Sequence, residues 1–187
     1  MMAQRRAKGR FWSRLVRVGI AALPLAGEKI QHVPLLWPPL GSIETYAAGL
    51  AAGIIALFGA LPALIKTKAL AKTGAWIGLG LSVFSLFVYG YFLLTYVKGV
   101  ETNDKGTLYR TIGSQRTDEA LQKCHGMTDS EMLEYAGLKD SDIERMWTST
   151  SVNRARFELF VSYILCFASA NFAIGAFVRA SPDTTAK

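Results

Sequence analysis

The feature that most constrains this 187-residue chain is a pair of apolar runs between Glu44 and Val97, separated only by the short basic link 66–73. A third apolar run, from Phe157 to Val178, follows the polar interval 98–156. An α-helix needs about 20 residues to cross the hydrocarbon core of a bilayer, and each run reaches that length. The sequence therefore predicts an all-α membrane protein with three transmembrane helices.

The placement of charge supports this prediction. The three runs carry no charged side chain except Glu44 and Glu158, which stand at the starts of the first and third runs. A charge in the middle of a bilayer is costly, so charge-free stretches of this length are typical of membrane spans. We expect five regions, which are a basic arm with a Pro-rich approach (1–42), a transmembrane hairpin (43–97), a small helical extramembrane segment (98–156), a third transmembrane helix (157–179) and a tail (180–187).

The N-terminal segment 6–23 is amphipathic at helical spacing, and Pro24 ends it. Its apolar side is too short to span, so we expect an interfacial helix whose arginines bind the phosphates of anionic lipids, namely Arg6, Arg10, Arg14 and Arg17. A secretory signal peptide and a mitochondrial presequence are alternative interpretations. The net charge of +7 is concentrated here, and since no nucleic-acid motif accompanies it, we expect no nucleic-acid partner.

Small residues recur along the apolar runs. Gly49 and Gly53 form a GxxxG pair in the first run, and Gly74 and Gly78 are spaced in the same way in the second. Helices associate in lipid through close backbone approach, so we expect these glycines to pack the two runs against each other. Asn171 lies well inside the third run, and its amide is expected to bond across a helix interface.

The polar segment predicts a loop around residues 99–106, followed by three short helices. The first helix is expected to begin after Thr117. Thr128 with Glu131 predicts a capping box for the second, which Gly137 ends, and Ser141 with Glu144 predicts a capping box for the third. A unit of this size buries little core alone, so we expect it to rest on the membrane or on a partner.

The distribution of basic residues predicts the orientation. Sixteen Lys and Arg residues lie in regions 1–42 and 98–156, against three in the link and two after the third run, Arg179 and Lys187. The positive-inside rule places the first two regions in the cytoplasm of a bacterial inner membrane or in the matrix of a mitochondrial inner membrane.

No motif in the sequence indicates a reaction. The chain lacks HExxH, GxSxG, Walker, Rossmann and CxxC patterns and has no paired carboxylates within a span. Cys124 and His125 are adjacent but cannot close a four-ligand zinc site. We therefore expect no enzyme, no catalytic residue, no metal and no cofactor.

Three hypotheses of function remain, and the weakest of them is a lipid- or headgroup-binding scaffold that would act through Arg10, Arg14 and Arg17. The first is a non-catalytic accessory subunit of a larger membrane complex, bound to other membrane subunits through small-residue packing and to anionic lipids. The alternative is a homo-oligomeric pore or membrane-perturbing effector, whose lumen would be lined by the polar side chains of the spans, namely Ser82, Ser85, Thr95, Ser162, Ser169 and Asn171.

Overall fold

The computed structural model describes residues 16, 18–26, 33, 34, 36–102 and 106–181. Three long helices dominate it, namely α3 (Glu44–Ala60), α4 (Lys68–Tyr96) and α8 (Ser149–Ala180). A 3-10 turn, η3 (Leu61–Leu64), extends α3. Each of the three is long and apolar enough to cross a membrane, and this agrees with the spans expected from the sequence.

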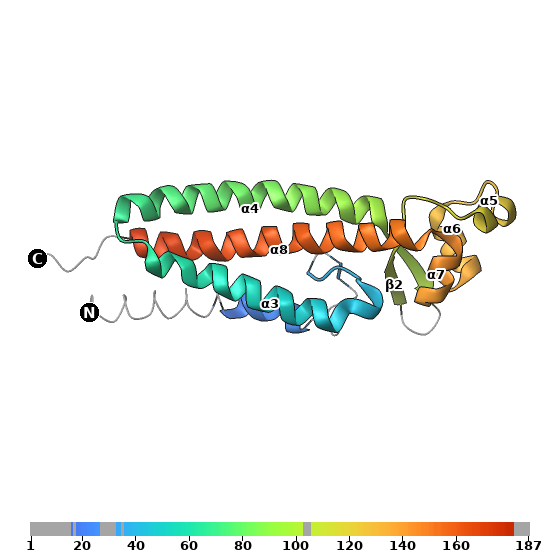
Figure 1. Ribbon diagram of the computed structural model, residues 1–187, viewed down its shortest axis with the longest axis horizontal. Helices are drawn as coiled ribbons and strands as arrows, with labels where there is room; N and C mark the ends of the chain where they lie inside the picture. Colours follow the sequence, from blue (N-terminus) through green and yellow to red (C-terminus); the bar gives the residue numbers. More distant parts are fainter. Residues whose placement is uncertain (1–15, 17, 27–32, 35, 103–105, 182–187) are drawn as a thin grey trace, which may run out of the picture.

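The last of these helices occupies the centre of the bundle. Helix α8 packs along both α4 and α3, and in Figure 1 it lies between them over its length. Half of its apolar stretch is buried, against 28% for the first span and 17% for α4. The expected packing of the first run directly against the second is therefore wrong, because the central helix separates them.

Helix α8 also begins earlier than the sequence predicted. It starts at Ser149 rather than Phe157, so its first two turns belong to the polar region. Arg154 and Glu158 pair across one turn, with Nε and Oε1 2.8 Å apart, and Arg156 is buried. Because the charged side chains of these first turns have partners, α8 can begin within the charged region rather than after it. The polar unit and the third span thus share one continuous element.

A two-stranded antiparallel sheet stands where the sequence predicted a loop. Strand β1 (Val97–Thr102) continues directly from α4, and β2 (Gly106–Thr111) pairs with it so that Val97 faces Thr111. The strands contain Val, Thr and Tyr, which suit a pleated, half-buried surface. The loop prediction is therefore wrong at both strands.

Three short helices complete the polar unit, as expected, namely α5 (Asp118–Lys123), α6 (Asp129–Ala136) and α7 (Asp140–Met146). The Thr128 and Glu131 capping box is present, and Gly137 ends α6 with a φ of 107°. The capping box predicted at Ser141 and Glu144 for the third helix is wrong. Helix α7 begins at Asp140, and Asp142 caps its first turn by accepting from the Lys139 N–H at 3.3 Å.

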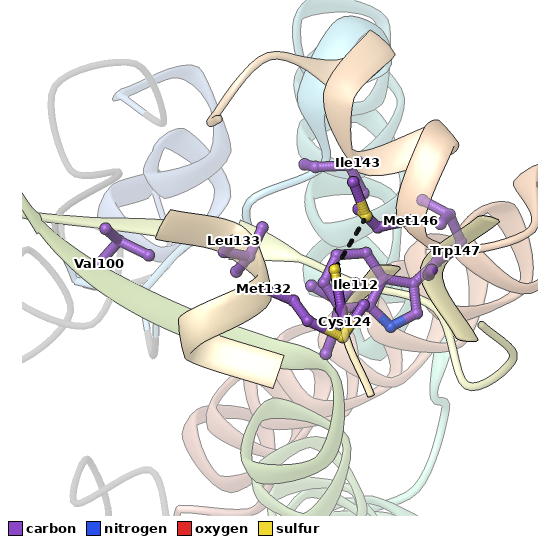
Figure 2. Close-up of a cluster of buried hydrophobic side chains, with 10 residues drawn as sticks. Val100, Ile112, Cys124, Met132, Leu133, Ile143, Met146 and Trp147 are labelled. Atoms are coloured by element: carbon purple, nitrogen blue, oxygen red, sulfur yellow. Dashed lines mark hydrogen bonds between the residues drawn. The ribbon is translucent and has the colours of Figure 1, made fainter. Parts of the chain in front are cut away.

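The polar unit has a hydrophobic core of its own. Figure 2 shows side chains from β1, α6, α7 and the flanking segments converging around Cys124, whose Sγ lies 4.0 Å from Met146 Sδ. The start of α8 contributes Val152, so the core is shared with the third span. The buried members are Val100, Ile112, Ala120, Cys124, Met132, Leu133, Ile143, Met146, Trp147 and Val152.

Candidate helix-packing site and membrane junction

The interface between α4 and α8 depends on glycines of α4. A Cβ atom placed at Gly78 would lie 3.0 Å from Phe172 Cδ1 and 3.2 Å from Ala173 Cβ, and at Gly74 the nearest atoms of Phe172 would be at 3.6 Å. The absence of a side chain at Gly78 therefore permits close backbone approach. The main partner of both glycines is α8; of the first run, Ile65, at its end, comes within 4 Å of the Cβ position of Gly74.

Side chains from both helices reinforce this interface. The Ser82 hydroxyl donates to the backbone carbonyl of Cys166 at 3.1 Å. Nearer the other end, the rings of Trp76 and Phe177 meet edge to face, with centroids 5.5 Å apart. Within lipid, interhelical hydrogen bonds and van der Waals packing are the main sources of association, and both are present here.

The interface between α3 and α8 centres on one amide. Asn171 is buried, and its Nδ2 donates to the backbone carbonyl of Ile55 at 3.0 Å, across the helix interface at which the sequence expected a bond. Gly59 provides the space, because a Cβ atom there would lie 2.5 Å from Asn171 Nδ2. The role of Gly59 was missed, although its small size was visible in the sequence.

A second face of α3 carries small, exposed residues. Gly49 and Gly53 are exposed, and a Cβ atom at either would meet no atom within 4 Å. Ala56 and Ala60 continue the same helical face and are also exposed. We call these four residues the outer α3 face. It is flanked by large exposed side chains, namely Tyr46, Leu50 and Leu57.

An aromatic cluster fills the bundle near its polar end. Trp37 is fully buried, meets Tyr163 edge to face at 5.2 Å, and donates its indole N–H to Glu44 Oε1 at 2.7 Å. The Tyr89 hydroxyl donates to the backbone carbonyl of Pro34 at 2.6 Å. These contacts hold the Pro-rich approach against α4 and α8.

A buried arginine joins the polar unit to the bundle. Arg156 of α8 donates from Nη2 to Asp140 Oδ1 at 3.0 Å, and its side chain is only 5% exposed. Gly41 lies directly on this pair, with a φ of 67° and room for no Cβ. Nearby, the Thr111 hydroxyl donates to the carbonyl of Pro39. Four segments therefore meet at this junction, namely the approach to α3, β2, α7 and α8.

Exposed charges are paired on the surface of the polar unit. Glu119 of α5 accepts from Lys123 at 2.8 Å and from Arg145 of α7 at 3.0 Å. Hydrogen bonds and the positive charge of these two partners hold the pKa of Glu119 below its usual range. The backbone N–H and hydroxyl of Thr128 likewise lower the pKa of Glu131. These pairs organise the short helices.

The remaining predicted residues fall outside these contacts. Arg6, Arg10, Arg14 and Arg17 lie outside the described residues, which show helix at 18–22 and then η1 (Leu23–Ala26) against α3. Among the described residues, no three His, Cys, Asp or Glu side chains gather so that they could hold a metal ion.

Known proteins do not supply a relative for this arrangement. No protein-family model, no curated protein and no solved structure matches the chain.

Proposed function

We propose that this protein is a non-catalytic subunit of a larger membrane complex, which binds a helix of another subunit along the outer α3 face. The observation that supports this most is that two faces of α3 have different surroundings. Its inner side is occupied by α8, whereas Gly49 and Gly53 form a shallow surface between exposed large side chains. Exposed apolar side chains are ordinary in lipid, but small residues between ridges favour helix association.

The positions of the polar side chains support this proposal over the pore alternative. Ser82 donates to the carbonyl of Cys166, Ser162 to that of Glu158 and Asn171 to that of Ile55. The bonds of Ser82 and Asn171 join two helices of one chain, whereas Ser162 bonds within α8. A lumen between copies would need such groups on the outside of the bundle.

We further propose a bacterial or mitochondrial inner membrane, with the polar unit in the cytoplasm or matrix and anionic lipids beside the basic arm. The excess of Lys and Arg in regions 1–42 and 98–156 supports this orientation. The contact of Gly41 with Arg156 and Asp140 puts the approach to α3 at the same end of the bundle as the polar unit.

The test is a pair of leucine substitutions. The complex is extracted from its own membrane in mild detergent and resolved on a blue-native gel with protein identification. We expect different proteins in fixed ratio with the wild type, and their loss with Gly53→Leu. Gly80→Leu is the matched control, because Gly80 is also an exposed helix glycine with no atom within 4 Å of its Cβ position.

Three outcomes would contradict the proposal. A lone monomer in mild detergent would remove the partner subunits, and unchanged assembly of Gly53→Leu would remove the outer α3 face as their binding site. A ring of identical copies would favour the pore alternative, and conductance in liposomes would then be measured.

A further inference from the structure

A cavity of about 310 Å³ opens where α4 ends and the polar unit begins. Five polar side chains line it, namely Thr95, Tyr96, Ser114, Arg116 and Asp129. Trp147 forms part of its wall, and Figure 2 shows the same indole packed beside Cys124 and Ile112 in the core of the polar unit. The cavity thus has a rigid floor and a polar lining.

Arg116 is fixed within this lining but retains binding capacity. Its backbone forms an antiparallel bridge with Trp147, and its Nη2 donates to the Met127 carbonyl at 3.1 Å and to Asp129 Oδ1 at 2.8 Å. Its Nε and Nη1 have no acceptor among the described residues. A guanidinium carries five N–H donors and stays charged, so these donors can bind an anion. The Asp129 carboxylate lies next to the Arg116 guanidinium and can bind a cationic group.

The depth of the cavity in the membrane follows from the length of the uncharged stretch of α4. Lys72 and Lys98 bracket an uncharged stretch of this region, residues 73–97, which is about 37 Å long at about 1.5 Å per residue. The hydrocarbon core is about 30 Å thick. Thr95 and Tyr96 lie at the end of this stretch, so the cavity stands at the level of lipid headgroups.

An apolar track leads along α4 from the cavity toward the bilayer centre. Phe84, Phe87, Tyr91 and Thr95 follow one another at helical spacing on one face. The first three are 66%, 74% and 64% exposed, and Thr95 is exposed at the cavity. A molecule bound in the cavity can therefore extend an acyl chain along this face.

We infer that the cavity binds the headgroup of an amine-bearing phospholipid, with its phosphate on Arg116, its amine on Asp129 and an acyl chain along the α4 track. The paired opposite charges match a zwitterionic phosphate and amine in one ligand. The volume lies at the small end of the range for ligand pockets, as a headgroup requires. This inference is independent of the proposed assembly function.

The experiment uses the full chain, purified in mild detergent, stripped of lipid and incubated with dioleoyl phosphatidylethanolamine. Bound lipid per protein is counted by native mass spectrometry. We expect one lipid per chain, and at least a ten-fold loss of occupancy in Arg116→Gln. Arg145→Gln is the matched control, because Arg145 makes an ion pair of the same kind with Glu119 away from the cavity.

Two further variants keep the inference testable if Arg116→Gln fails to fold. Thr95→Trp places a large side chain in the cavity while both members of the ion pair are kept, and it is expected to abolish binding. Leu94→Trp, at an 80% exposed neighbouring position, is expected to leave binding unchanged. Asp129→Asn is expected to weaken phosphatidylethanolamine ten-fold but to retain phosphatidylglycerol, which has the phosphate without the amine.

Equal occupancy in the wild type and Thr95→Trp would overturn the site. Displacement of the lipid by glycerophosphoethanolamine at equal concentration would overturn the lipid assignment, because the phosphate and amine alone would then suffice and the acyl track would contribute nothing.

Discussion

Replacing Gly78 by leucine tests whether close contact between α4 and α8 stabilises the bundle. A Cβ atom at this position already lies 3.0 Å from Phe172 Cδ1 and 3.3 Å from Ala173 Cα. The Phe172 ring can turn aside, but the backbone of α8 cannot move without separating the two helices. The three further carbons of leucine therefore have no space in the wild-type packing.

The expected cost follows from this geometry. Extra methylene groups forced into a packed interior cost about 1–3 kcal/mol, and a backbone obstacle places Gly78→Leu at the upper end of that range. A loss of about 3 kcal/mol changes the unfolding equilibrium by roughly 100-fold. For Gly78→Ala we expect a loss of about 1 kcal/mol, since the three nearest atoms of Phe172 and Ala173 must shift by only a few tenths of an ångström.

The measurement is reversible unfolding in mixed micelles with a rising fraction of SDS, followed by circular dichroism. Gly80→Leu, two residues along α4, is the control, because no atom lies within 4 Å of its Cβ position. We expect it to change the free energy of unfolding by less than 0.5 kcal/mol, as is usual away from packed features. Equal losses at Gly78 and Gly80 would refute the reasoning, since the packing contact at Gly78 would then not explain the loss; helix propensity favours leucine over glycine at both positions and predicts no loss.

Two other predictions concern the polar unit. Arg156→Met removes the buried cation facing Asp140 and is expected to destabilise the protein by about 3 kcal/mol in the same SDS titration. Arg154→Met, at an exposed pair with Glu158, is expected to cost less than about 1 kcal/mol. Equal costs for the two variants would contradict this prediction. Because the folded-state pKa of Glu119 is lowered, its contribution to stability is present above its ordinary pKa and lost as pH falls through the lowered value. Glu119→Gln is expected to flatten the acid side of the stability profile, and an unchanged profile would contradict it.

Much of the architecture follows from local patterns in the sequence. The lengths of the uncharged runs predict the three spans, because lipid excludes charge over a fixed thickness. The capping box of Thr128 and Glu131 and the stop at Gly137 predict α6, because these residues satisfy the backbone at its two ends. Such features depend only on residues that are close together in the chain, so they can be predicted from a single sequence.

The pairing of the helices could not be predicted in this way. Gly53 and Gly78 stand in similar small-residue patterns, yet one faces outward and the other faces α8. Small residues indicate that a helix can be approached closely, but not by which helix. The start of α8 was missed for a related reason, since Arg156 is paired with Asp140 of another helix, and this pairing cannot be read from the residues next to Arg156 in the sequence.

The hairpin of β1 and β2 was missed although a signal was present. Val, Thr and Tyr on both sides of residues 103–105 are typical of strands joined by a short turn. Gly99, Gly106 and Asn103 in the same stretch favour a loop, and the loop prediction rests on them rather than on this enrichment. The strands are also short, and their pairing is supported by packing of β1 on α6 and of β2 on α8, which local propensity does not contain.

The central position of α8 has a consequence for biogenesis. This helix follows α3 and α4 in the chain, yet it supplies the main packing surface for both of these earlier helices. At roughly 5–20 residues per second, the ribosome takes several seconds to pass from the end of α4 to the end of α8. During that interval the first two spans have been made but lack the helix that supplies most of their packing surface, so the bundle can form only after α8 has been synthesised.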